Sequence, residues 1–515
     1  MFFIKILVYS IFIGTTISWR LFSRKTRINI DKQITIDTSH LSFLKQDELS
    51  EIDGFFGMIG PNIKTSKVES LFEIFTGDGI INGVFFKKDG TITYVQHLIQ
   101  TEKMQHETRF GKLMMHPIFM PILMFLYNCG LTPNPIGVAN TAFMKTSTRL
   151  FTLFERDLPY EIYLDYDKNL VKTLKKMKTP SLTHFSGHSR FENDRIKTIG
   201  YKMWEKRVEY REFDDDFILK RSLNFPTKYL PIVHDFITTE SNTFLFADSP
   251  FKFSMSITNP VIFDKNQTTI FHIEKRNVRY KIDTNESFYI FHYGQVKENT
   301  TSIEFYASAY DNIDFSKIDI CGKYRRFSVC LKTGTVDISK NVELEQYNLD
   351  FPVKCGQYTI LRNLDLENRK INGFLLCDGL EICDQFFFED RSFCGEPALL
   401  NTHQGQKYLT AFTYSKNGKS FFTMIRILGT GEFDRDIIEI PVPEKIGIGF
   451  HSSFFPVSST GSKFIKTSTN SLTFLLNCFS FGSLEYSSGF IRLLSIRIKL
   501  TCFSEMGNKL NQNVS

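Results

Sequence analysis

Four histidines lie far apart in this sequence, and each ends or follows a short apolar run typical of a β-strand: His188, His234, His292 and His451. Each has small or polar residues close by, and none has a neighbouring cysteine. A lone histidine is usually structural, but four in similar settings indicate a metal centre with only imidazole ligands. Their separations are far wider than the ligand spacings of zinc fingers or HExxH helices. Only a fold that brings strand ends from all round the molecule to one axis could gather them.

Residues 180–456 have the pattern of short strands separated by turn residues. Runs such as FKFSMSI, ESFYIFHY and SFFTMIRI have strand length and many aromatic or β-branched residues. We find no convincing helical run in this region and no repeat of the WD or kelch kind. The residues alone therefore predict an all-β fold and leave sandwich, barrel and propeller open. No Pro-rich, Gly/Ser-rich or highly charged linker divides the middle, which favours one large domain.

An apolar segment occupies residues 2–19 and is near the lower length limit for crossing a bilayer. Four basic residues follow it at once: Arg20, Arg24, Lys25 and Arg27. The positive-inside rule then predicts that residues 1–30 are an anchor with the main body in the cytosol. A cleaved signal peptide remains open, because residues 15–18 are small enough for a cleavage site.

Cysteine usage and charge limit the compartment and the partners. The nine cysteines are odd in number and have no regular framework, which favours a reducing compartment. The formal charge of +6 is spread along the chain, and its densest basic run, residues 172–178, is short. This run is best explained as a solvated face, so we expect no nucleic-acid partner.

Several motifs are more specific than composition: GFFGMIGPN at 54–62, FTGDGI at 75–80, ANTAF at 139–143, RLFTLFERDLPYEI at 149–162 and VHDFITTE at 233–240. Together they resemble the carotenoid cleavage oxygenase family, which includes plant and bacterial carotenoid dioxygenases, stilbene-cleaving enzymes and the animal retinoid isomerohydrolase. The resemblance runs from about 54 to about 456. Three positions depart from the family pattern, with Met58 replacing arginine, Ile80 replacing methionine and Asn82 replacing histidine.

The resemblance implies a seven-bladed β-propeller, residues 31–456, with helices or loops forming a dome over the metal-bearing face. It places one Fe(II) per chain on His188, His234, His292 and His451. It also implies that three acids hold these imidazoles from behind: Glu155, Asp350 and Glu396. Glutamate is commoner than aspartate at the second acid, and Glu343 or Glu345 could be the true partner. Imidazole suits iron, copper, nickel and zinc alike, so the choice of Fe(II) rests on the resemblance.

The implied activity is cleavage of a conjugated C=C bond by O₂, which gives two carbonyl products. The expected substrate is a carotenoid, an apocarotenoid or a stilbene-like lipophile. The PDPCK motif of the animal branch is absent, while ANTAF and DLPY resemble the plant and bacterial branch, which favours oxygenation over retinoid ester isomerohydrolysis. A third hypothesis is a catalytically silent, membrane-associated propeller that binds a lipid or a partner. Retention of all four histidines argues against this last hypothesis.

Residues 110–135 are rich in Met, Leu, Phe and Ile and are cut by prolines. We expect an interfacial segment that dips into one leaflet at the mouth of a substrate tunnel, although a buried helix remains open. The residues predicted to contact the membrane and admit substrate are Phe119, Met120, Leu123, Met124, Phe125 and Leu126. Residues 457–515 lie beyond the resemblance and form a C-terminal extension of unknown role.

Overall fold

The computed structural model describes residues 31–63, 68, 70–105, 134, 137–179, 184–254, 259 and 261–457. The chain divides into two compact units, Met1–Ser458 and Ser459–Ser515, and all described residues belong to the first. The expectations for residues 1–30 and 458–515 therefore stay predictions. In the described part of the chain, no helix has the length and apolar character needed to cross a membrane.

The described residues are mostly β-strands in antiparallel sheets. The first sheet contains β1 (Lys32–Ile36), β4 (Ile92–Leu98), β3 (Gly79–Phe86), β2 (Gly54–Pro61) and β32 (Ser452–Pro456), in that order. A second sheet contains β5 (Phe143–Lys145), β6 (Leu150–Thr152), β7 (Tyr160–Asp165) and β8 (Leu170–Lys176). A third contains β9 (Arg190–Glu192), β10 (Arg195–Lys202), β11 (Arg207–Phe213) and β12 (Leu219–Pro226).

The middle of the chain continues this pattern. The fourth sheet contains β13 (Ile237–Thr238), β14 (Phe244–Asp248), β17 (Ile270–Lys275) and β18 (Val278–Asp283), and a separate hairpin of β15 (Phe251–Phe253) and β16 (Val261–Phe263) lies between β14 and β17 in the sequence. The fifth contains β19 (Tyr289–Glu298), β20 (Ser302–Tyr310), β21 (Lys323–Cys330) and β22 (Thr335–Ser339).

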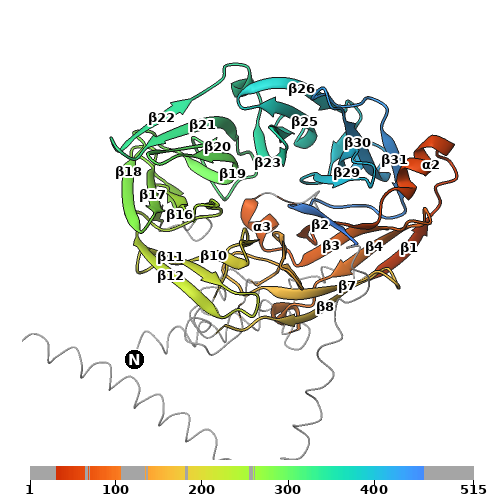
Figure 1. The fold of residues 1–515 in the computed structure, drawn as a ribbon, viewed down its shortest axis with the longest axis horizontal. Helices are drawn as coiled ribbons and strands as arrows, with labels where there is room; N and C mark the ends of the chain where they lie inside the picture. The colour runs from red at the N-terminus through yellow and green to blue at the C-terminus, as the bar shows by residue number, and fades with distance from the viewer. Residues whose placement is uncertain are drawn as a thin grey trace, which may run out of the picture. The chain divides into compact units, whose positions relative to one another are not determined.

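The last sheet has nine strands and resolves into two four-stranded units joined through β27 (Arg391–Phe393). One unit contains β23 (Leu349–Cys355), β24 (Tyr358–Asp365), β25 (Lys370–Asp378) and β26 (Glu381–Phe387). The other contains β28 (Ala398–Asn401), β29 (Lys407–Ser415), β30 (Ser420–Ile427) and β31 (Ile438–Val442). Counted this way, the described residues form seven blades around one axis, as Figure 1 shows. The predicted all-β propeller is confirmed.

The two ends of the propeller meet in its first sheet. Strand β32 pairs antiparallel with β2, with Phe455 opposite Phe55 and Ser453 opposite Gly57. The last described strand therefore completes the blade that the first strands begin. A ring of sheets needs such a closing pair, because each blade otherwise contacts only its neighbours in the sequence.

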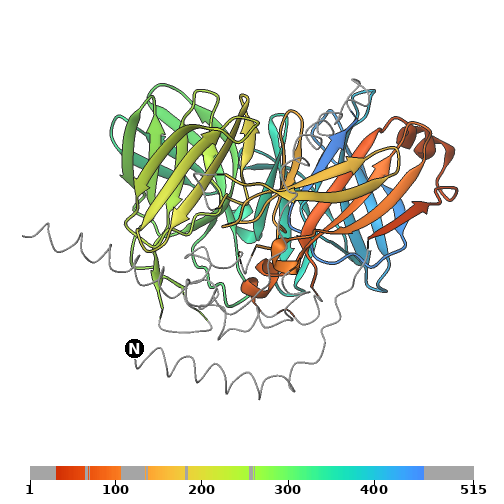
Figure 2. The same cartoon turned by 90° about the horizontal axis from the view of Figure 1, so that it is seen from below.

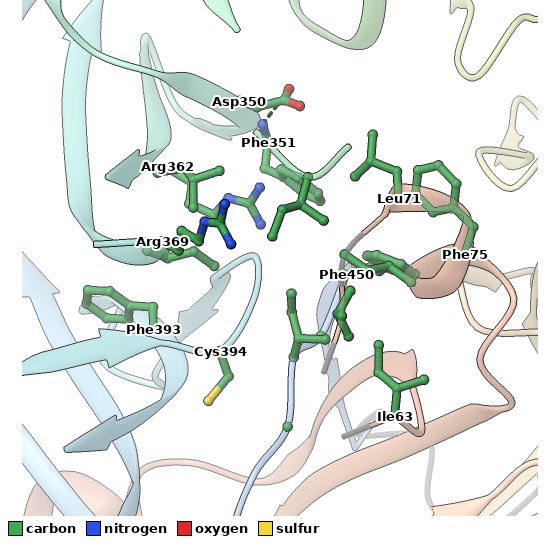
Figure 3. Close-up of a pocket in the computed structure, with 18 of the residues that line it drawn as sticks. Ile63, Leu71, Phe75, Asp350, Phe351, Arg362, Arg369, Phe393, Cys394 and Phe450 are labelled. Atoms are coloured by element: carbon green, nitrogen blue, oxygen red, sulfur yellow. Dashed lines mark hydrogen bonds between the residues drawn. The ribbon is translucent and has the colours of Figure 1, made fainter. Parts of the chain in front are cut away.

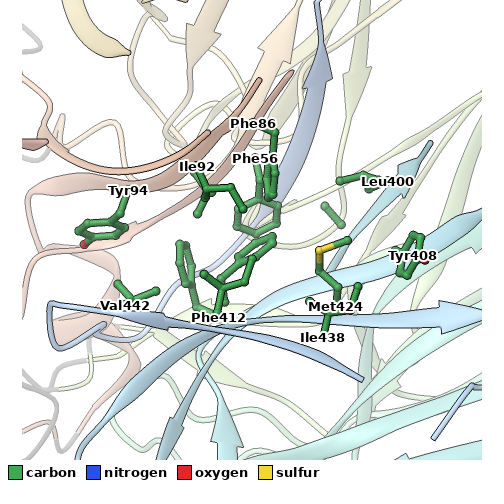
Figure 4. Packing of buried hydrophobic residues seen from close by; sticks show 14 of the residues in the cluster. Phe56, Phe86, Ile92, Tyr94, Leu400, Tyr408, Phe412, Met424, Ile438 and Val442 are labelled. Carbon is green, nitrogen blue, oxygen red and sulfur yellow. The ribbon is translucent and has the colours of Figure 1, made fainter. Parts of the chain in front are cut away.

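Aromatic side chains fill the space between neighbouring sheets. Phe56 of β2 packs against Phe412 of β29 (Figure 4), with ring centroids 5.4 Å apart. The ring centroid of Phe422 is 4.9 Å from that of Phe56. A second aromatic cluster joins the fourth and fifth sheets, where Phe271 and Phe305 are 5.4 Å apart. Each buried phenylalanine contributes roughly 1.5–3 kcal/mol to folding. This packing explains much of the high phenylalanine content of the chain, 53 residues.

The described helices are short. They are α2 (Phe43–Ser50), α3 (Leu71–Phe75), the 3-10 turn η3 (Leu344–Gln346) and the helical residues 102–105. Ser70 caps α3 by accepting a hydrogen bond from the backbone N–H of Glu73 at 3.3 Å. Helix α3 buries Leu71 and Ile74 and lies against one face of the ring, as Figure 2 shows. It is a described part of the predicted dome.

Candidate metal centre

The four predicted histidines come from four different blades, each at or near the start of the strand on the inner edge of its sheet. His188 precedes β9, His234 precedes β13, His292 lies in β19, and His451 directly precedes β32. In a propeller the innermost strand of each blade faces the central axis. The structure therefore brings together residues that are distant in the sequence.

The imidazoles converge closely enough to share one ion. One nitrogen from each ring lies within 4.8 Å of the other three. Nε2 of His188 and Nε2 of His234 are 2.9 Å apart, and the His292 and His451 ring centroids are 5.1 Å apart. Two nitrogens that are each about 2.1 Å from one metal ion lie roughly 3–4 Å apart. The spacing therefore fits a single cation held by four imidazoles.

Three carboxylates occupy the outer nitrogens of three rings. Nδ1 of His292 is 2.9 Å from Asp350, Nδ1 of His451 is 2.9 Å from Glu396, and Nδ1 of His234 contacts Glu155. Each carboxylate accepts a hydrogen bond from the Nδ1–H group, which leaves the lone pair of Nε2 free to bind a metal. Nε2 of His292 is buried and has no hydrogen-bond partner among the described residues, which is what a missing ligand to that atom would leave. The donor set therefore fits a metal ion.

Burial favours the neutral, metal-binding form of two of these rings. Burial lowers the pKa of His188 well below its usual value, and the other three imidazoles add to this effect. Burial also lowers the pKa of His292, although Asp350 opposes the shift. For His234, burial lowers the pKa, but Glu155 and the nearby acids reverse the net direction. A metal cation would compete with the added proton for Nε2 of His234, because metal binding releases protons from its ligands.

The acid partner of His292 is Asp350, the residue that the resemblance assigned. Although burial raises its pKa, His292 and the Tyr310 hydroxyl together lower it to about 2. Tyr310 donates to Oδ2 at 2.5 Å, and the backbone N–H of Phe351 donates to Oδ1 at 2.8 Å. Of the two alternatives, Glu343 is exposed and Glu345 pairs with Arg325 at 3.2 Å. Neither glutamate is the partner of His292 in this structure.

Each of the seven blades contributes one residue to this centre. Four blades supply the histidines, and the other three supply Glu155 after β6, Asp350 in β23 and Glu396 before β28. The centre is therefore a property of the whole ring. Its completion depends on the pairing of β2 with β32, because His451 stands at the start of β32.

Other residues position the histidines and were not singled out from the sequence. Ser186 donates from Oγ to the carbonyl of His234 at 3.1 Å and accepts the backbone N–H of His188 at 3.0 Å, so it ties two of the rings together. Asp235 pairs with Arg190 and accepts the backbone N–H of Tyr293 at 3.3 Å, next to His292. Small and acidic residues beside the histidines were the available signal, but they do not reveal their partners.

The departures from the family motif lie in the first blade. Met58 is buried, and its sulfur would be 2.4 Å from a Cβ added at Gly449 and 3.1 Å from one added at Gly395. Asn82 accepts hydrogen bonds from the Tyr94 hydroxyl and the Gln96 amide, each at 2.9 Å. Both polar and apolar departures are therefore accommodated by local packing.

A cavity of about 710 Å³ opens beside the histidines. Its walls include His234, His292 and His451 and are otherwise largely apolar, as Figure 3 shows for some of the residues: Ile63, Leu71, Phe75, Phe351 and Phe450. Such a cavity fits a long apolar ligand. The residues predicted to line its membrane-facing mouth, Phe119, Met120, Leu123, Met124, Phe125 and Leu126, lie outside the described residues, so their role stays a prediction.

Comparison with known proteins gives the same picture. The family model described as retinal pigment epithelial membrane protein matches residues 50–456. A curated relative, carotenoid 9,10(9',10')-cleavage dioxygenase 1 of Phaseolus vulgaris, is 23% identical over 479 residues, which cover 78% of this chain and 84% of the relative. The Arabidopsis thaliana protein of the same name is 28% identical over 228 residues, but the match spans only 40% of that relative and 39% of this chain.

Two solved structures share the fold. The lignostilbene dioxygenase of Pseudomonas brassicacearum has a TM-score of 0.67 at 16% identity, with 83% of this chain and 96% of that chain covered. A variant of Synechocystis apocarotenoid oxygenase has a TM-score of 0.66 at 17% identity, with 84% and 97% covered. At this identity the likeness concerns the fold alone. Since the family model matches most of the chain, the protein belongs to the family of the retinal pigment epithelial membrane protein and the carotenoid cleavage oxygenases, a family of oxygenase enzymes.

Proposed function

We propose that this protein is a non-haem, Fe(II)-dependent dioxygenase that cleaves a conjugated C=C bond of a carotenoid or apocarotenoid. One oxygen atom of O₂ would enter each of the two carbonyl products. The observation that supports this most is the convergence of four imidazoles on one space, with three outer nitrogens tied to carboxylates, beside an apolar cavity. The names of the bean and Synechocystis relatives point to the same substrate class.

The four histidines would hold the iron, which would supply the activation of O₂. Four neutral ligands leave positions open for small molecules, and the three carboxylates offset the charge of the ion from behind. The apolar wall, including Phe75, Phe291 and Phe450, would hold the alkene by shape and exclude water. We infer no acid or base residue beyond this centre.

Metal content and isotope labelling test the proposal together. We expect the purified full-length protein to contain close to one iron per chain and to incorporate ¹⁸O from ¹⁸O₂ into both products of an apocarotenoid. His234→Ala should remove both iron and turnover. His403→Ala is the matched control, because His403 is exposed on a turn and should leave both unchanged.

The outcomes separate the alternatives. Product formation from a retinoid ester without ¹⁸O would instead indicate isomerohydrolysis. Absence of bound iron from a folded protein would indicate a catalytically silent propeller. Cleavage of a stilbene but of no carotenoid or apocarotenoid would retain the reaction and change the substrate class, in line with the name of the Pseudomonas relative.

A further inference from the structure

One cation in the cavity wall, the guanidinium of Arg362, has no hydrogen-bonded partner in the part of the chain that the structure describes. Arg362 of β24 is half-buried and lines the cavity, and Figure 3 shows its side chain pointing into the pocket. Its Nε is buried without a hydrogen-bond partner among the described residues. A guanidinium stays protonated in proteins and carries five N–H donors. The Phe351 ring faces this guanidinium at 3.7 Å but offers no hydrogen-bond acceptor, so the N–H donors stay unpaired in a largely apolar cavity, which is costly.

Several other arginines of the described residues pair with carboxylates, whereas Arg156, which also lines the cavity, donates to the sulfur of Met203 at 3.3 Å. The buried Arg325 pairs with both oxygens of Asp311, at 2.5 and 2.8 Å. Arg369, which also lines the cavity, pairs with Asp319 at 3.0 Å and is well exposed. The situation of Arg362 therefore does not follow from a shortage of acids in this chain.

The two carboxylates that interact electrostatically with Arg362, Asp350 and Glu396, already accept hydrogen bonds from other groups. Burial lowers the pKa of Arg362, and the carboxylates of Asp350 and Glu396 oppose the shift. Asp350 accepts hydrogen bonds from His292, the Phe351 N–H and Tyr310. Glu396 accepts hydrogen bonds from His451 and from the backbone N–H of Ser452. These acids provide a favourable field at the guanidinium, but they do not receive its hydrogen bonds.

The position of Arg362 relative to the metal centre is defined by one aromatic ring. Its guanidinium carbon lies 3.7 Å from the centroid of the Phe351 ring, and that ring centroid is 4.4 Å from the centroid of His292. Phe351 therefore separates the cation from the imidazoles. A ligand held by Arg362 would still reach the histidines along the cavity, because all these side chains line it.

We propose that Arg362 is a subsite for the carboxylate end group of the substrate. This inference rests on the proposed function and narrows it to lipophilic polyenes that end in a carboxylate. A planar guanidinium binds a carboxylate through two parallel hydrogen bonds, and the bond is strong where water is excluded. Because only one ring layer separates Arg362 from His292, the C=C bond presented to the metal centre lies near the carboxylate end. Cleavage then releases a short carboxylate-bearing fragment and a longer apolar carbonyl product.

The test measures binding to metal-free, full-length protein, so that it does not depend on turnover. The probes are a conjugated polyene carboxylic acid and its methyl ester, titrated at pH 7.5 and followed by the absorbance shift of the polyene. We expect the wild-type protein to bind the acid at least 10-fold more tightly than the ester. Arg362→Met should abolish this preference by weakening acid binding and leaving ester binding unchanged, and Arg362→Lys should restore part of it.

Arg369→Met is the matched control, since it removes the same charge from the same cavity. Because Asp319 already balances Arg369, this variant should keep the preference for the acid. A short free carboxylate such as hexanoate, added in excess, should weaken acid binding to the wild-type protein but not to Arg362→Met. This competition shows that the carboxylate alone is recognised at Arg362.

Two results would overturn the subsite. The first is equal affinity of the wild-type protein for acid and ester, a measurement that needs no variant and holds even if Arg362→Met does not fold. The second is a preference that survives in Arg362→Met, which would make Arg362 a counter-charge for Asp350 and Glu396 instead. An active oxygenase without the preference would contradict the subsite alone. A protein with the preference but without iron or turnover would contradict the proposed function alone.

Discussion

The four histidines differ in the group that contacts the ring nitrogen facing away from the metal site. Three have a carboxylate on Nδ1, whereas the described ring contacts of His188 are with the other imidazoles. A carboxylate fixes the ring orientation and raises its basicity, so these three rings should bind a cation more strongly than an isolated imidazole. Asp350 is the best connected of the acids, because Tyr310 also donates to it. Burial raises the pKa of Tyr310, so its hydroxyl keeps the proton that it donates.

The charge of Asp350 can be tested apart from its shape. Asp350→Asn keeps the size of the side chain but removes the negative charge, so we expect iron affinity to fall roughly 10- to 100-fold. The measurement is competition with a chelator of known affinity. Glu345→Gln is the control, since Glu345 pairs with Arg325 and should leave iron affinity unchanged. Equal losses in both variants would mean that Asp350 acts only through the overall charge.

At the scale of single elements, the backbone bends where the site requires it. Strand β23 has a register shift between Asp350 and Val353, and Phe351 there has a φ of 57°, a rare conformation for a bulky residue. This irregularity turns Asp350 toward His292 and lets the Phe351 ring pack on the imidazoles. Strain of this kind persists only where surrounding contacts enforce it, and it concentrates at functional sites.

The approach of β2 to the segment before His451 permits a second test. A Cβ at Gly60 would lie 2.6 Å from Cα of Gly449 and 2.7 Å from the carbonyl oxygen of Ile448, and both are backbone atoms that cannot rotate away. The backbone N–H of Gly449 also donates a hydrogen bond to the carbonyl of Cys394 at 2.7 Å, so the segment before His451 has little room to shift.

We therefore expect Gly60→Ala to destabilise the fold by about 1–3 kcal/mol through overpacking and to displace His451 enough to weaken iron binding. Chemical denaturation and iron content measure the two effects. Gly429→Ala is the control, because nothing lies within 4 Å of a Cβ at that position. Wild-type iron affinity in a folded Gly60→Ala protein would show that the site tolerates movement of β2.

At the scale of the whole molecule, features encoded by neighbouring residues could be predicted from the sequence, whereas features that depend on long-range contacts could not. The strands and the four histidines were predictable, because apolar runs and motifs such as VHDFITTE are local. The choice between Asp350 and Glu345 depended on a strand irregularity, and the isolation of Arg362 depends on which acids are already bonded. These are consequences of register and of long-range contacts, and one sequence does not display them.

The ring arrangement leads to a final prediction about closure. Ser453 lies in β32 opposite Gly57, so Ser453→Pro would place a residue without an N–H, and with a fixed φ, in the pair that joins the two ends of the propeller. We expect a loss of stability of about 1–3 kcal/mol, because proline removes a backbone hydrogen bond of the strand pair and leaves its acceptor unpaired. Because His451 stands two residues earlier, iron should be lost as well.

A proline elsewhere distinguishes closure from general damage. Tyr280→Pro changes β18 opposite Ile273, in an edge strand of the fourth sheet that pairs with β17 alone among the described strands and carries no residue of the centre. This variant should lower the midpoint of thermal unfolding yet retain close to one iron per chain below that midpoint. If Ser453→Pro also retained iron at temperatures where it is folded, the pairing of β2 with β32 would not be needed to assemble the four imidazoles. If both variants lost iron equally, iron loss would reflect only the global stability of the fold. It would then give no evidence that the centre depends on closure of the ring.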